Sequence, residues 1–187
     1  MRRLCVRKKR GELYMCKKIK EVNSLDPKTI LENYWDGKIP VNIKGMLSAI
    51  GVHFCDHDFS DLEQALRLNN NDAILGIAFS NGDELGILYS SKIDKDATNY
   101  VLAHELAHCC LHMKPAEEFH VELKVSHDLY AGVRGKSLFA GYKESYKENQ
   151  ADRFAADLLI PTQALSEYFS FYVSSLVALL ISGHLMP

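Results

Sequence analysis

The chain has 187 residues, of which 47% are hydrophobic and 25% charged, and its formal net charge is −2. This length and composition fit a folded domain with a sizeable core and exclude a disordered or low-complexity chain. The five cysteines form no CxxC pair and no apolar run follows the basic start, so we expect free thiols and a cytoplasmic location rather than a disulfide-rich secreted scaffold.

Charge is distributed unevenly along the chain. The first 20 residues contain nine Lys or Arg and one acidic residue, Glu12, which gives this segment a net charge of +8. Such a segment is either a solvated terminus or a binding site for nucleic acid or an acidic surface. We expect the first, although direct nucleic-acid binding stays open. The chain is therefore divided into a basic arm (1–20), a main domain (21–163) and a C-terminal helical segment (164–187).

Two helices are predicted near the start of the main domain. Asp26-Pro27 supplies an N-cap and a first-turn proline for one helix, and apolar residues follow at helical spacing. A second helix is predicted to open at Pro40. Residues 52–55 are a candidate short strand, whereas residues 61–72 are polar and ambiguous.

A β-hairpin and a long helix are predicted next. The apolar runs 73–79 and 84–89 are joined by an Asn-Gly-Asp sequence that is typical of a turn. Either Asp94 or Asp96 is expected to cap the helix that follows, which runs to about Met113.

The last third of the chain is predicted to be mostly helical. Residues 118–125 alternate between apolar and polar and indicate a strand, and helical periodicity over 143–160 ends before Pro161. One or two further helices fill 162–185. They include the uncharged run Tyr168 to Gly183, which is shorter than the ~20 apolar residues of a membrane span. We expect this segment to pack on the main domain or to face a partner.

The long helix contains His104-Glu105-Leu106-Ala107-His108, an HExxH sequence. Positions i and i+4 of a helix share a face, so His104 and His108 can direct a ring nitrogen at one metal ion. Glu105 then lies beside the metal, where it can take a proton from a water molecule.

Catalytic zinc takes three protein ligands, so a third must come from elsewhere. The metzincin pattern is excluded because Leu111 and Lys114 occupy the positions where it needs glycine and histidine. His112 lies one turn after His108, but three histidines at i, i+4 and i+8 drift around the helix axis. We therefore expect His112 to support the ligands or to face solvent.

The predicted helix 143–160 offers two carboxylates. Glu148, Ala151, Asp152 and Ala155 share one of its faces, and small residues there favour close packing against the HExxH helix. On spacing alone, Glu148 is equally compatible with a metal ligand and an exposed surface charge. Asp152 is the reserve ligand.

Two sequences of this chain, YVLAHELAH over residues 100–108 and ENQADRFAADLLIP over 148–161, resemble the ImmA/IrrE family of zinc metallopeptidases. The resemblance implies that His104, His108 and Glu148 bind Zn²⁺ and that Glu105 is the catalytic base. It implies an α+β, zincin-like fold of the gluzincin type, with a small antiparallel sheet packed on the HExxH helix. Ala107 departs from the family's usual glycine, and the 39 residues between His108 and Glu148 are unusually many.

The resemblance further implies a regulatory protease that cleaves a helix-turn-helix repressor of a phage or mobile element. The alternative is a zinc-bound module, or a toxin–antitoxin component, that sequesters a partner protein without cleaving it. Candidates for stabilising the oxyanion are His127, Tyr130, Tyr142 and Tyr146, and an exposed edge of the hairpin is a candidate site for an extended substrate. The His53–His57 sequence, with two histidines on one strand, is interpreted as a surface strand rather than a second metal site.

Overall fold

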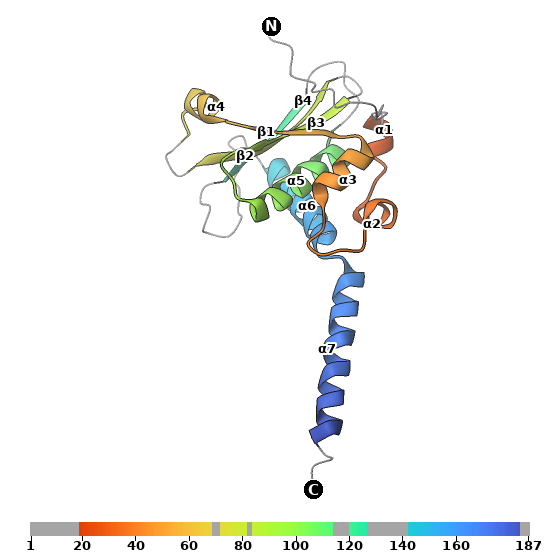
Figure 1. Cartoon of the computed structure of the whole chain (residues 1–187). Helices are drawn as coiled ribbons and strands as arrows, with labels where there is room; N and C mark the ends of the chain where they lie inside the picture. Colours follow the sequence, from red (N-terminus) through yellow and green to blue (C-terminus); the bar gives the residue numbers. More distant parts are fainter. Residues whose placement is uncertain (1–18, 69–71, 82–83, 114–119, 127–141, 184–187) are drawn as a thin grey trace, which may run out of the picture.

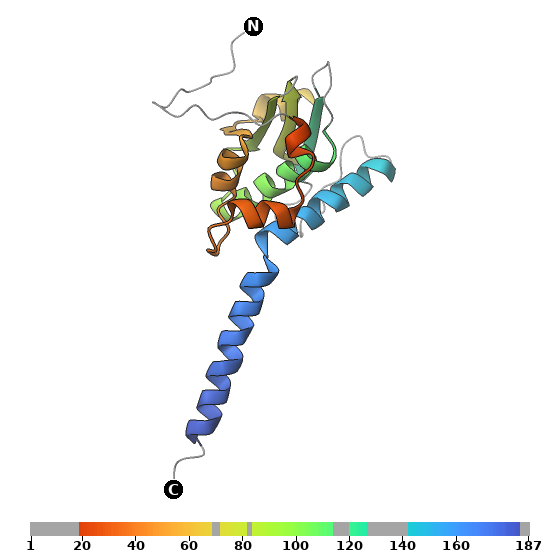
Figure 2. The same ribbon diagram turned by 90° about the vertical axis from the view of Figure 1, so that its right-hand side faces the viewer.

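The computed structural model describes residues 19–68, 72–81, 84–113, 120–126 and 142–183. The fold is α+β: one mixed four-stranded sheet is packed on a buried helix, with further helices beside it (Figures 1 and 2). The basic arm lies almost entirely outside these residues. In chain order the elements are α1 (Ile19–Val22), α2 (Pro27–Tyr34), α3 (Ile43–Ile50), β1 (His53–His57), α4 (Ser60–Ala65), β2 (Ala73–Asn81), β3 (Glu84–Ser90), α5 (Lys95–Leu111), β4 (His120–Ser126), α6 (Tyr142–Leu159) and α7 (Thr162–Gly183).

The first long helices begin at side-chain caps. Asp26 accepts a hydrogen bond from the Thr29 amide at 2.7 Å, as the Asp26-Pro27 sequence predicts for α2. The second helix, α3, begins at Ile43 rather than at Pro40, because the Asn42 side chain accepts from the Gly45 amide at 3.0 Å and so caps the helix there. Helix α4 is a feature that the polar residues 61–72 did not predict.

The strand order in the sheet is β1-β3-β2-β4. The hairpin β2–β3 and the pair β2–β4 are antiparallel, as expected, but β1 pairs parallel to β3, so the prediction of a purely antiparallel sheet is wrong. Successive strands β1, β2 and β3 alternate in direction, and β3 rather than β2 lies beside β1, so the neighbouring strands β1 and β3 are parallel. The hairpin strands are both interior, which corrects the expectation that one of them offers a free edge.

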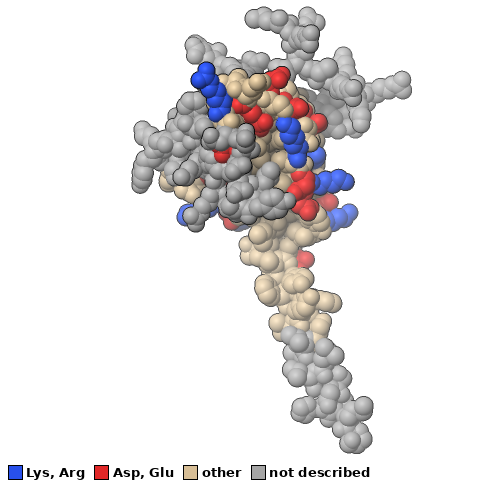
Figure 3. Space-filling view, turned by 90° about the vertical axis from the view of Figure 1, so that its left-hand side faces the viewer, with Lys and Arg blue, Asp and Glu red and all other residues tan. Residues whose placement is uncertain are grey.

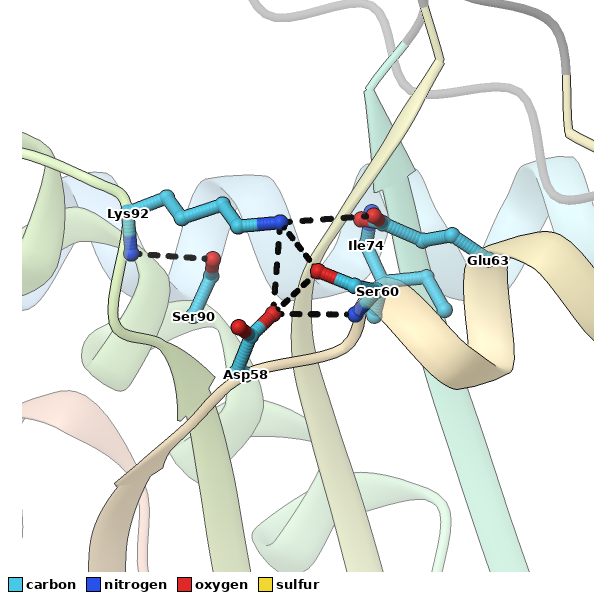
Figure 4. A network of polar contacts seen from close by, with 6 residues as sticks. All are labelled: Asp58, Ser60, Glu63, Ile74, Ser90 and Lys92. Atoms are coloured by element: carbon cyan, nitrogen blue, oxygen red, sulfur yellow. Dashed lines mark hydrogen bonds and ion pairs between the residues drawn. The ribbon is translucent and has the colours of Figure 1, made fainter.

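A small network of polar side chains fixes α4 to the sheet (Figure 4). Lys92 donates to Ser60 Oγ at 2.6 Å and lies 3.2 Å from Asp58 Oδ1, and Glu63 accepts from the Ile74 amide at 2.9 Å. Hydrogen bonds from Ser60, followed by that of Lys92, lower the pKa of Asp58 to about 2. The network satisfies the Ile74 amide near the start of β2 and joins the end of β3 to the loop after β1.

Helix α5 lies against β2 and β3 on one side and against α3 and α6 on the others. Every residue from Val101 to Cys110 is buried, so the helix is enclosed on all sides. Asp94, rather than Asp96, caps it by accepting from the Ala97 amide at 2.6 Å. Burial raises the pKa of the Cys110 thiol to about 12, which leaves it a neutral part of the core.

The contact between α5 and α6 uses small side chains. Ala103 and Ala107 of α5, and Ala151 and Ala155 of α6, are all fully buried. Alanine at a helix crossing lets the two backbones approach closely. This approach brings polar side chains of α6 to the HExxH face of α5.

The last helix, α7, extends away from the body of the domain (Figures 1 and 2). Four of its aromatic side chains, Tyr168, Phe169, Phe171 and Tyr172, are at least half exposed, so this part of the helix does not pack on the domain. The other expectation, a helix that faces a partner, stays a prediction. No helix among the described residues is both long and apolar enough to cross a membrane.

Candidate metal centre

Three side chains converge where α5 and α6 cross. His104 Nε2 lies 3.0 Å from His108 Nε2 and 3.2 Å from Glu148 Oε2, and His108 Nε2 lies 3.2 Å from Glu148 Oε1. Both histidine side chains are fully buried or nearly so, and that of Glu148 is 15% exposed. The structure therefore brings together the two HExxH histidines and the first of the two candidate carboxylates, across 39 intervening residues.

The spacing of these atoms suits a tetrahedral metal ion. Zinc bonds of about 2.0–2.1 Å place neighbouring ligand atoms of a tetrahedron about 3.3 Å apart. In this site the two histidine nitrogens lie 3.0 Å apart, and each lies 3.2 Å from a different oxygen of Glu148. Two imidazole nitrogens and one carboxylate are also a donor set of catalytic zinc sites, so the residues fit the ion. Within the part of the chain that the structure describes, this is the one group of three His, Cys, Asp or Glu whose ligand atoms all lie within 4.8 Å of one another.

Asp152, the reserve ligand, has a different position. Its Oδ1 lies 2.8 Å from His104 Nδ1, the ring nitrogen on the side away from Glu148 and His108, and also accepts a hydrogen bond from the Tyr100 hydroxyl at 2.6 Å. A carboxylate behind a histidine ligand keeps the proton on Nδ1 and leaves Nε2 free for a metal. Asp152 therefore orients His104 rather than joining the ligand group.

The protonation states in the site suit cation binding. Burial raises the pKa of Glu148, but hydrogen bonds from ring protons of His104 and His108 outweigh burial and hold the pKa well below its usual value. A metal ion bound to both Nε2 atoms would displace those protons to Nδ1 and take their place as the positive partner of the carboxylate. Burial, followed by the hydrogen bond to Asp152, raises the pKa of Tyr100 well above its usual value. Tyr100 thus stays a neutral donor beside an anionic Asp152.

Glu105 follows His104 directly but is not one of the three converging residues. Its side chain is fully buried and lies against β2 at Gly76. A Cβ atom on Gly76 would come within 2.6 Å of Glu105 Oε1 and 2.8 Å of Val101 Cγ1. The absence of a side chain at this position of the sheet is what admits the Glu105 carboxylate.

We expect Gly76→Ala to disturb Glu105 specifically. The added methyl group has no room beside Val101 and the carboxylate, so the free energy of unfolding should fall by about 1–3 kcal/mol. Chemical denaturation of the two proteins measures this change. As a control, Ala73→Gly in the same strand removes a methyl group and should cost only the ~0.5–1 kcal/mol typical of glycine in a strand. A loss in Gly76→Ala no larger than this would contradict a steric role for Gly76.

The other residues singled out in the sequence lie away from this site or outside the described residues. His127 and Tyr130 belong to the latter group, as does the side chain of Tyr142, and Tyr146 is 63% exposed on α6. The strand His53–His57 is mostly exposed and takes no part in the metal-binding group, in agreement with its interpretation as a surface strand.

Three residues that contact the site residues were not predicted from the sequence. Gly76 was hidden because only the tertiary structure places it opposite Glu105, and Gln150, which contacts His112, was hidden for the same reason. Tyr100 carried a signal that could have been used. It precedes His104 by four residues and so shares its helix face.

The chain was compared with known proteins. The family model Peptidase_M78, described as the IrrE N-terminal-like domain, matches residues 51–179. This range is more than two-thirds of the chain and contains the three converging side chains and Glu105. No curated protein and no solved structure matches the chain.

Proposed function

The chain belongs to the Peptidase_M78 family of IrrE N-terminal-like domains, and from this premise we propose that it is a zinc-dependent endopeptidase with a gluzincin-type, zincin-like domain. The observation that carries the proposal is the convergence of His104, His108 and Glu148, whose ligand atoms all lie within 4.8 Å of one another. The presence of Glu105 beside these ligands favours an enzyme over a module that only binds metal.

The bound ion would be held by the two Nε2 atoms and the Glu148 carboxylate. Zinc at this position supplies a Lewis acid that activates water and polarises a carbonyl group at neutral pH. Asp152 and Tyr100 keep His104 oriented, since both lie on its far side. The anionic Glu148 offsets part of the charge of the cation.

Glu105 would move the protons of the reaction. Its carboxylate accepts a proton from the attacking water and returns it to the amine of the departing peptide. Contact with β2 at Gly76 fixes the direction of the side chain, so the base is positioned before substrate binds.

We further propose that cleavage is regulatory and that the substrate is a helix-turn-helix repressor encoded beside the protein on a phage or mobile element. The support is membership of the family alone, and the match over residues 51–179 includes both the HExxH sequence and the sequence 148–161. The zinc-bound module that sequesters its partner is the competing function.

One experiment separates these functions. The purified protein is analysed for metal and incubated, with and without added zinc, with the product of the adjacent regulator gene. A discrete cleavage product that requires zinc supports the proposed protease. Stable complex formation with zinc bound, and an intact partner under every condition, would support the sequestering module instead.

A further inference from the structure

A second pair of polar side chains lies behind His108. His112 Nδ1 is 2.9 Å from His108 Nδ1, and His112 Nε2 is 3.2 Å from Gln150 Oε1. His112 is the C-cap residue that directly follows α5, whereas Gln150 lies on α6, two residues after Glu148. The pair thus connects the His108 ring to α6, the helix that provides Glu148.

The positions of the protons follow from the role of His108. Its Nε2 faces Glu148 and His104 and can bind a metal only with a free lone pair, so its proton must be on Nδ1. That N–H donates to His112 Nδ1, which must therefore lack a proton. His112 then carries its own proton on Nε2 and donates it to the amide oxygen of Gln150. His108, His112 and Gln150 therefore have a single arrangement of donors and acceptors that satisfies both contacts.

We propose that His112 and Gln150 are positioning residues that hold His108 in its metal-binding tautomer and orientation. This inference rests on the proposed metal site. The backbone of His112 also hydrogen-bonds to the His108 carbonyl at 2.9 Å, but that bond does not involve the imidazole. A substitution of the side chain therefore tests positioning without removing the backbone bond at the helix end.

Zinc affinity, measured by competition with a chelator in the absence of substrate, tests this inference. His112→Phe keeps a ring but removes both nitrogens, and we expect it to weaken zinc binding about 10–100-fold. His112→Gln restores an acceptor and a donor and should recover part of the loss, and Gln150→Leu should show a smaller loss. Leu111→Ala, at the adjacent exposed position, is the matched control and should bind zinc as the wild type does.

Wild-type affinity in His112→Phe, or an equal loss in Leu111→Ala, would overturn the inference. Denaturation of the metal-free proteins shows whether a variant has lost stability as well as zinc affinity. If the loss of affinity parallels a loss of stability and His112→Gln does not restore it, the effect is one of folding, which would also contradict the inference. A wild type that binds zinc but cleaves nothing refutes only the proposed function.

The surface of α7 carries an independent inference. Leu165, Phe169 and Tyr172 are exposed and follow the alternating four- and three-residue spacing of a coiled-coil seam. Glu167 is the one charged residue in the helix, and Figure 3 shows its described part without Lys or Arg. A group of neighbouring aromatic side chains that are at least half exposed marks an interaction surface.

We infer that the occupant of this surface is α7 of a second copy of the chain. A helix that lies on a membrane surface carries Lys and Arg on its polar face, which α7 lacks. The basic arm is too highly charged to cover aromatic rings. The three aromatic side chains on or beside this seam, Tyr168, Phe169 and Tyr172, measure about 150–250 Å² each and are half or more exposed. They leave on the order of 350 Å² per copy, so two copies approach the ~1,000 Å² lower range of a specific interface, which suits a concentration-dependent dimer.

Molar mass in solution, measured by light scattering over a range of concentrations, tests this inference. We expect a dimer for the wild type and at least ~100-fold weaker association for Phe169→Glu/Tyr172→Glu, with zinc binding unchanged. Ser170→Glu/Ser174→Glu adds the same charge on the opposite side of the helix and should stay dimeric. A monomeric wild type, equal dissociation of both variants, or a wild type that binds anionic vesicles as a monomer would overturn it.

Discussion

Glu105→Gln should lower kcat by about 10²–10⁴-fold, because the amide has nearly the same shape as the carboxylate but cannot accept the proton of the attacking water. Zinc affinity should stay within a few-fold of the wild type, since Glu105 is not among the three converging residues. The measurements are peptide hydrolysis under saturating substrate and chelator competition for zinc.

Glu32→Gln is the matched control for this substitution. Glu32 lies on α2 with an exposed side chain that pairs with Lys28 at 3.8 Å, far in sequence from the site. It should leave both kcat and zinc affinity unchanged. Turnover in Glu105→Gln that equals the control would show that another group serves as the base.

Glu148→Ala should have the largest effect on metal binding. It removes the anionic ligand and leaves two histidine nitrogens 3.0 Å apart, so the loss of affinity should exceed the ~10–100-fold typical of residues that only support a ligand. Ligand that binds only the folded state stabilises it by about 4 kcal/mol at 1,000 times Kd. Thermal unfolding should therefore shift strongly with zinc in the wild type and little in Glu148→Ala.

Asp152→Asn provides the comparison for this prediction. It keeps the three ligands and removes only the charge behind His104, so its zinc-dependent shift in unfolding temperature should lie between those of the wild type and Glu148→Ala. The reverse order would make Asp152 the ligand and Glu148 the supporting residue.

Local features of the fold were predictable because they depend on neighbouring residues. A cap accepts a hydrogen bond from an amide three residues away, and this identified Asp26 as the cap of α2 and narrowed the cap of α5 to Asp94 or Asp96. The structure shows that Asp94 is the cap. Alternation and helical periodicity likewise predicted the hairpin, β4 and α6 to within a few residues. The HExxH sequence belongs to the same class, since its two histidines share a face on any α-helix.

The sequence by itself thus determined two ligands, a neighbouring carboxylate and the helix that carries them. Only the tertiary structure decided which of the α6 carboxylates lies with them, because Glu148 and Asp152 share a helix face and differ by one turn against α5. It also decided the parallel pairing of β1, the direction of α7 and the contact of Gly76 with Glu105. Each depends on the packing of segments far apart in the chain, and periodicity specifies which face of an element is apolar but not which element covers it.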